Sequence, residues 1–179
     1  RQCTIVDDHI VRKRQPLRYR AGNAGGDWRV TDPYSFGPVL GPMDDYYIAE
    51  GSHLRLFDKL GSHLMSHEGA AGVHFAVWAP NARRVSVVGD FNHWDGRTHL
   101  MAAHGSSGVW EMFIPDLAQG ALYKYEIFST TGELLVKTDP YANAFQLRPN
   151  TAALAGANTT HIWQDEHWMA RRNHWDWLH

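Results

Sequence analysis

The chain has 179 residues, of which 17 are basic and 19 acidic, so it is long enough for one domain with a substantial extension. It has no Lys/Arg stripe, no polybasic tail and no apolar run near the ~20 residues of a membrane span, and we expect neither a nucleic-acid nor a membrane partner. Because the single Cys3 excludes an internal disulfide and the polar start is unlike a signal peptide, we expect a cytoplasmic protein.

The beginning of the chain resembles a later segment. Residues 17–34 (LRYRAGNAGGDWRVTDPY) and 122–141 (LYKYEIFSTTGELLVKTDPY) both contain an aromatic and basic strand, a glycine turn, a second strand and Thr-Asp-Pro-Tyr. Such self-similarity indicates two related modules, although Asp-Pro-Tyr is also a common strand exit. We interpret residues 1–38 as the C-terminal remnant of a first β-sandwich module that extends upstream in the natural protein.

Residues 39–68 are predicted to be a linker with a short helix. Gly-Pro pairs interrupt regular structure there, and Leu54, Phe57 and Leu60 have the spacing of a short amphipathic turn.

Residues 69–150 have the pattern of short antiparallel strands. In GVHFAVWAP (residues 72–80), Val73, Phe75 and Val77 alternate with His74, Ala76 and Trp78. Similar runs follow at residues 83–90, 108–115, 122–128 and 130–140. Turn signals about every ten residues predict an all-β, immunoglobulin-like antiparallel β-sandwich.

The tail, residues 151–179, contains the tryptophans Trp163, Trp168, Trp175 and Trp177. So many indoles in a short polar segment are hard to solvate, and we expect them to pack on a part of the protein outside this chain. A C-terminal helix folded back on the sandwich is the alternative.

The sequence shows no catalytic motif, cofactor site or metal site. Its 12 histidines lack ligand spacing: His67-Glu68 begins like a zincin helix, but residue 71 is alanine. A phosphate-binding glycine loop, a dinucleotide fingerprint and a nucleophile elbow are also missing. A glycosidase carboxylate pair is a spatial feature, which sequence spacing cannot exclude.

The run GDFNHWDG, residues 89–96, is the main candidate binding site. It follows a valine-rich strand, so Trp94 is expected at a sheet edge, where its flat apolar ring matches the face of a glucose unit. The sugar hydroxyls would then be free to bond Asn92, Asp95 or Lys124. Hiding about 100 Å² gives roughly 2.5 kcal/mol, less than the ~4 kcal/mol of millimolar affinity. A second contact is therefore needed, and the alternative is that Trp94 caps the core or docks on a neighbouring domain.

Residues 74–96 (HFAVWAPNARRVSVVGDFNHWDG) and 108–142 resemble the family 48 carbohydrate-binding module, which precedes the catalytic barrel in glycogen branching enzymes and related α-amylase-superfamily enzymes. The run DPYSFGPVLGPMDDYYIAEGSHLRLFDKLGSHLM is typical of bacterial 1,4-α-glucan branching enzymes with two tandem N-terminal modules. This resemblance implies a parent enzyme that cuts an α-1,4-glucan and rejoins it through an α-1,6 bond without an organic cofactor. It also implies that residues 151–179 lead to a catalytic barrel absent from this chain, which itself carries no catalytic residue.

The resemblance further implies that Trp94 and Lys124 contact α-glucan or glycogen, with the parent's own barrel as a second partner. Glycogen-binding members have another tryptophan after the hairpin turn, where this sequence reads GELLVK. The module is therefore expected to serve partly as a spacer and docking surface. Three alternatives remain: a module of a debranching enzyme, one of a glycogen-targeting regulatory subunit, and a purely structural sandwich.

Overall fold

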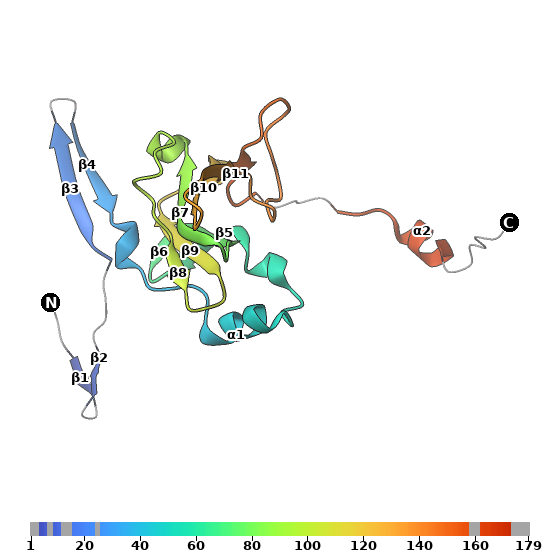
Figure 1. The fold of residues 1–179 in the computed structure, drawn as a ribbon, viewed down its shortest axis with the longest axis horizontal. Coiled ribbons are helices and arrows are strands. Elements are labelled where there is room, and N and C mark those ends of the chain that lie inside the picture. The colour runs from blue at the N-terminus through green and yellow to red at the C-terminus, as the bar shows by residue number, and fades with distance from the viewer. Residues whose placement is uncertain (1–3, 7–8, 12–15, 24–25, 158–161, 173–179) are drawn as a thin grey trace.

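The computed structural model describes residues 4–6, 9–11, 16–23, 26–157 and 162–172 (Figure 1). The strands are β1 (Thr4–Val6), β2 (His9–Val11), β3 (Arg18–Asn23), β4 (Gly26–Thr31), β5 (Gly61–His67), β6 (Ala70–Trp78), β7 (Ala82–Gly89), β8 (Ala102–His104), β9 (Val109–Pro115), β10 (Leu122–Ser129), β11 (Leu134–Lys137) and β12 (Ala153–Leu154). The helices are α1 (Pro42–Glu50) and α2 (Glu166–Arg171), with 3-10 turns η1 (Pro33–Ser35), η2 (Leu56–Asp58) and η3 (Asp90–Asn92).

Two antiparallel sheets pack face to face, which confirms the predicted all-β sandwich. The first sheet has the order β5-β6-β9-β8, and in the second sheet β10 pairs with β7 on one edge and with β11 and β12 on the other. The alternation read from the sequence is correct, because Val73, Phe75 and Val77 all point into the core. Both sheets contribute to this core, whose buried members are Val73, Phe75, Val77, Val85, Val87, Met101, Met112, Ile114, Tyr123, Tyr125, Ala153 and Ala155.

The sandwich extends beyond residues 69–150 in both directions. Strand β5 pairs with β6 along its whole length, from Gly61↔Ala76 to His67↔Ala70, although residues 61–67 were assigned to the linker. At the other end, β12 pairs with β10 at Leu122↔Leu154. Strand β5 was missed because polar side chains such as Ser62 and His63 interrupt its hydrophobic pattern.

The linker packs against the outer face of the first sheet. Leu40 and Leu60, which are 3% and 2% exposed, form a second apolar cluster with Ala76 and Val109 of that sheet. Helix α1 begins at Pro42 and has no fully buried residue, but its Ile48 is partly buried against this cluster.

The prediction that Leu54, Phe57 and Leu60 form an amphipathic turn is wrong in detail. Leu54 is 94% exposed and Phe57 is 58% exposed. The 3-10 turn η2 instead directs Leu56 towards the apolar cluster, together with Leu60.

The two Thr-Asp-Pro-Tyr sequences share a local structure. Tyr34 N–H donates to Asp32 Oδ1 over 2.9 Å, and Tyr141 N–H donates to Asp139 Oδ1 over 2.8 Å. Before the first of these turns the chain forms the hairpins β1–β2 and β3–β4 (Figure 1). The interpretation of residues 1–38 as part of another module remains a prediction.

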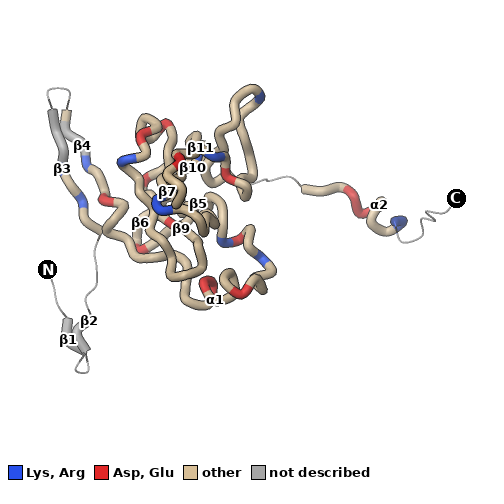
Figure 2. Tube along the Cα trace, in the orientation of Figure 1, with Lys and Arg blue, Asp and Glu red and all other residues tan. Residues whose placement is uncertain are grey.

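The tail contains α2, in which Trp168 is 57% exposed, and Trp163, which precedes this helix, is 72% exposed. Trp175 and Trp177 lie outside the described residues. Acidic and basic residues are interspersed along the described part of the chain (Figure 2). No helix among the described residues is long and apolar enough to span a membrane.

Candidate functional site

The loop that carries Trp94 leaves the end of β7 and is held by Asn92. This side chain is 7% exposed; its Oδ1 accepts from Gly89 N–H at 2.9 Å, and its Nδ2 donates to Val87 O at 2.8 Å and contacts His99 Nδ1 at 2.9 Å. The amide predicted to bond a sugar is thus already engaged inside the protein. The geometry assigns Asn92 the role of fixing the loop, because its side chain is buried and both its amide nitrogen and its carbonyl oxygen bond within the protein.

Trp94 lies at the outer end of this loop. Its side chain is 39% exposed, and its indole N–H donates to Asp90 Oδ1 over 2.9 Å. Because the one polar group of the ring is bound within the loop, the orientation of the indole is fixed while part of its surface remains open to solvent.

Lys124 projects from the outer face of the second sheet. Its neighbours Tyr123 and Tyr125 are fully buried in the core, and since side chains alternate along a strand, Lys124 and Glu126 point the other way. Lys124 Nζ donates to Thr151 Oγ1 over 2.8 Å.

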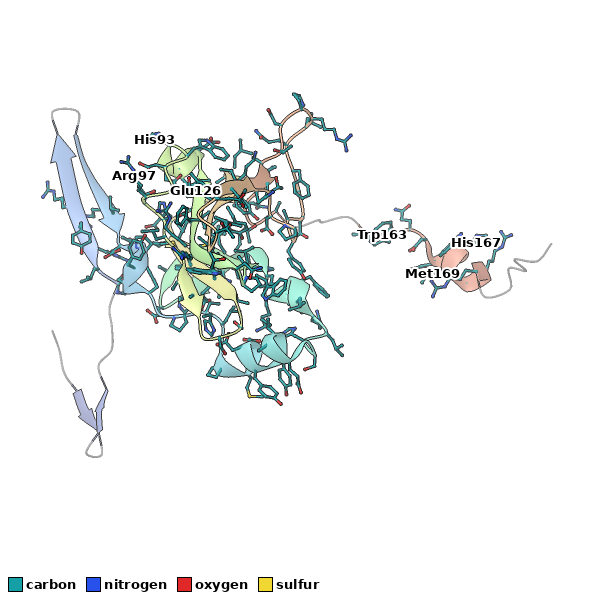
Figure 3. The ribbon with its side chains drawn as sticks, in the orientation of Figure 1. His93, Arg97, Glu126, Trp163, His167 and Met169 are labelled. Carbon is teal, nitrogen blue, oxygen red and sulfur yellow. The ribbon has the colours of Figure 1, made fainter. Side chains whose placement is uncertain are left out.

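The loop lies over this same outer face. The Glu126 carboxylate lies against Gly96 and leaves no room there for a Cβ, so the loop backbone rests directly on the Glu126 side chain. Figure 3 shows Glu126 beside the loop that carries His93 and Arg97. The structure therefore brings the loop that carries Trp94 to the face from which Lys124 projects.

Asp95 is engaged with Arg97. The guanidinium lies 2.7 Å from Asp95 Oδ2, and Arg97 N–H donates to Oδ1 over 2.9 Å. The hydrogen bonds from Arg97 lower the pKa of Asp95 to about 2, so this carboxylate is charged at neutral pH. A sugar hydroxyl at Asp95 would have to share it with Arg97.

Two exposed apolar side chains of β11 continue this face. Val136 is the cross-strand partner of Glu126 and Leu134 that of Phe128, which places both on the outer side of the sheet. They are 53% and 57% exposed. We call the surface formed by Trp94, Lys124, Glu126, Leu134 and Val136 the outer face of the second sheet.

Sequence reasoning missed three residues of this region. The alternation in LYKYEIF already places Glu126 beside Lys124, so its position was available from the sequence. No sequence pattern distinguishes Asp90, which bonds the indole, apart from its nearness to Trp94. Tyr34 contacts the loop from 64 residues away, and no local pattern predicts such a contact.

A buried polar cluster lies on the opposite side of the sandwich. Glu111 Oε2 accepts from the N–H groups of Val39 and Leu40, both at 3.1 Å, and lies 2.9 Å from His74 Nε2. Burial tends to raise the pKa of Glu111, but the hydrogen bond with His74 and those from the backbone outweigh it, and the pKa is lowered. Because these groups join the linker to the first sheet, we assign the cluster a structural role. No group of three or more His, Cys, Asp or Glu side chains in the described ranges is placed to hold a metal ion.

Residues 59–142 match the sequence family described as carbohydrate-binding module 48 (isoamylase N-terminal domain). The chain is 65% identical over 166 residues to the 1,4-alpha-glucan branching enzyme GlgB of Mesorhizobium japonicum and 61% identical to that of Rhizobium meliloti. Each alignment covers 92% of this chain and 22% of the relative, so the chain spans about a fifth of the length of these relatives.

Among solved structures, a Klebsiella pneumoniae pullulanase complexed with maltotriose is similar at a TM-score of 0.46 and 26% identity. That similarity covers 63% of this chain and 10% of the pullulanase. The assignment rests on the sequence matches. Residues 59–142 thus match the carbohydrate-binding module 48 family, and the chain is similar over 92% of its length to part of 1,4-alpha-glucan branching enzymes.

Proposed function

We propose that the outer face of the second sheet binds an α-1,4-glucan weakly. One observation carries this proposal: a partly exposed indole, bonded to Asp90, lies on a loop that packs over the face of Lys124, in a segment that matches a carbohydrate-binding module. The indole stacks on a sugar ring while Lys124 donates to the hydroxyl groups of the sugar. Asp95 accepts from a sugar hydroxyl only if its carboxylate bonds that hydroxyl and Arg97 at the same time.

The outer face also supplies the second contact that the energy estimate requires. Stacking on Trp94 gives roughly 2.5 kcal/mol, and Leu134 and Val136 add apolar area on the strand where glycogen-binding members have a tryptophan. These aliphatic side chains are smaller and not flat, so affinity stays near the millimolar range, where ~4 kcal/mol suffices. A polymer that offers many sites in one chain is then a better ligand than a short oligosaccharide.

At the level of the protein, we propose that this chain is the non-catalytic N-terminal part of a cytoplasmic glycogen branching enzyme. The similarity to branching enzymes and the share of their length that it covers support this role. The parent enzyme transfers α-1,4-glucan segments to form α-1,6 branches, and the catalytic barrel lies in the part of the relatives outside the match. The module helps to hold the glucan and docks on that barrel.

Substitution of Trp94 tests glucan binding. Trp94→Ala is expected to lower affinity for maltoheptaose more than tenfold, since roughly 2.5 kcal/mol of stacking is lost. Trp78→Ala is the matched control, because Trp78 is 58% exposed on the first sheet. Affinity is measured by NMR titration and by retardation of the chain in gels that contain glycogen. Equal affinity of the two variants would refute the proposal.

The same variants separate binding from a purely structural role. Removing a fully buried tryptophan costs about 3–5 kcal/mol, and we expect Trp94→Ala to cost less than about 2 kcal/mol because the side chain is 39% exposed. Urea unfolding measures this loss. A large loss of stability with unchanged glucan affinity would support the structural alternative instead.

The parent activity is tested with the full-length protein and amylose as substrate. The appearance of α-1,6 branches, measured by chain-length analysis after debranching, is the expected result. A protein that only hydrolyses α-1,6 bonds would instead be a debranching enzyme.

A further inference from the structure

The hydroxyl of Tyr34 joins the segment before the sandwich to the return limb of the Trp94 loop, which comprises residues 98–101. It donates to the carbonyl oxygen of Thr98 over 2.6 Å and accepts from Leu100 N–H over 2.8 Å. Burial raises the pKa of Tyr34, so the hydroxyl keeps the proton that it donates.

The return limb pairs with β7 through an isolated antiparallel bridge, Ser86↔Leu100. Val87 N–H donates to His99 O over 3.0 Å, and Met101 N–H donates to Val85 O over 2.8 Å. Because successive backbone groups of a strand point to opposite sides, Thr98 O and Leu100 N–H face away from β7. Tyr34 satisfies both of these outward groups with one hydroxyl.

The return limb is in turn bonded to the part of the loop that carries the indole. Thr98 Oγ1 donates to Asp95 O over 2.9 Å, and Asp95 is the residue after Trp94. Trp94 N–H donates to Gly89 O over 2.9 Å at the other end of the loop. A shift of the return limb therefore changes the segment in which Trp94 lies.

Tyr34 is itself fixed to the base of the hairpin β3–β4. Its N–H is capped by Asp32, whose own N–H donates to Leu17 O over 2.8 Å, just before β3. Leu17 N–H donates to Ser35 Oγ over 3.1 Å from the other side of the turn. The hydroxyl of Tyr34 thus connects the preceding hairpin to the candidate sugar-contacting loop.

We propose that Tyr34 is a positioning residue for the Trp94 loop, through which the segment preceding the sandwich sets the orientation of the indole and so the affinity for glucan. The part of this inference that concerns affinity rests on the proposed function. The part that concerns the loop is independent of any ligand.

The test is Tyr34→Phe in the 179-residue chain, which removes the hydroxyl and keeps the ring. Tyr46→Phe is the matched control, because Tyr46 is a 57% exposed tyrosine on α1. In Tyr34→Phe we expect the indole N–H resonance of Trp94, assigned with Trp94→Phe, to shift and broaden. The Leu100 amide should exchange with solvent about tenfold faster, since its acceptor is lost.

Glucan affinity and stability complete the experiment. We expect the dissociation constant for maltoheptaose to rise about two- to fivefold, the effect of one hydrogen bond. The unfolding temperature should fall by less than about 4 °C, because water replaces the hydroxyl at this exposed edge. Tyr46→Phe should change none of these quantities.

The outcomes distinguish the two proposals. If the Trp94 resonance of Tyr34→Phe matches that of the unsubstituted chain, the positioning role is overturned, even where the unfolding temperature falls. If the resonance moves while Trp94→Ala leaves glucan affinity unchanged, Tyr34 positions the loop but the proposed function fails. If the resonance moves and glucan binding depends on Trp94 but not on the Tyr34 hydroxyl, the link from the preceding segment to affinity is overturned.

Discussion

His93 and Trp94 both adopt left-handed backbone conformations, with φ angles of 54° and 59°. For residues other than glycine, such conformations cost about 1–3 kcal/mol each and persist only where surrounding contacts impose them. Here the contacts are the bonds of Asn92 to both ends of the loop and that of Trp94 N–H to Gly89. These left-handed conformations therefore lower the stability of the folded protein while they present one indole to solvent. Backbone strain of this kind is common at ligand-contacting sites.

The strain at His93 is testable. His93→Gly is expected to raise the free energy of unfolding by about 0.5–1 kcal/mol, because relief of the left-handed strain exceeds the entropy that glycine adds to the unfolded chain. His93→Ala keeps the strain and serves as the control. Urea unfolding of both variants is the measurement, and equal stability of the two would contradict the assignment.

For individual residues, the sequence predicted the positions of the candidate side chains better than their roles. Alternation along β10 placed Lys124 opposite the core residues Tyr123 and Tyr125, as the structure has it, whereas contact of Trp94 and Lys124 with a glucan stays a prediction. Asn92 was expected to face a ligand, yet it is buried, since only the folded loop brings Val87, Gly89 and His99 around its amide. Composition cannot show whether a polar group in a loop already has partners.

The linker before β5 is not a flexible connection, because it packs against the first sheet. Residues 36–60 cross the first sheet and are fixed there by Phe36 against Phe113 (ring centroids 4.9 Å apart), by Leu40 and Leu60, and by the carboxylate of Glu111. A carboxylate that accepts two successive backbone N–H groups holds the linker at one register, because both bonds are lost together if the linker slides.

Removal of the carboxylate should release the linker. Glu111→Ala is expected to cost about 3–5 kcal/mol, since it leaves His74 and two backbone N–H groups buried without their acceptor. Glu133→Ala, in an exposed turn, should change stability by less than about 0.5 kcal/mol. Urea unfolding gives both values, and hydrogen exchange at Leu40 locates the change. A loss below about 1 kcal/mol for Glu111→Ala would show that the linker is held by its apolar contacts alone.

The packing of the linker over the first sheet also explains why β5 was not predicted. A strand with one buried and one wet face alternates apolar and polar residues. On β5, however, Ser62 is buried towards the core, while the histidines of the opposite face lie partly under the linker. The pattern therefore depends on a segment that packs there only in the folded protein, and the sequence window around β5 does not contain that information.

For the molecule as a whole, the contact between linker and sandwich couples stability to pH. Burial tends to lower the pKa of His104, but its hydrogen bond with Asp45 and the charges of Glu111 and Asp45 outweigh this, and the pKa is raised. A histidine with a raised pKa in the folded state adds stability that is complete below its unfolded value near 6.5 and is lost as the pH rises through the folded value. Burial lowers the pKa of His74, which acts in the opposite sense.

Asp45→Asn isolates the contribution of His104, because His74 remains in both proteins. We expect the substitution to destabilise the chain more at about pH 6 than at about pH 9, where His104 is neutral. NMR titration of the His104 ring should show its pKa falling in the variant. An equal loss of stability at both pH values would mean that Asp45 acts through contacts that do not depend on the charge of His104.

Thr151 receives the Lys124 ammonium group two residues before β12, the strand with which the chain leaves the sandwich. Whatever follows residue 157 therefore starts within a few residues of the face that we assign to glucan. If the module binds glucan as proposed, a second glucan site placed after this exit would meet the same polymer in an intramolecular encounter, at an effective concentration set by the tether between the two sites. Under the proposed function, weak binding by the module would then be sufficient, because it would raise the local concentration of glucan at the second site.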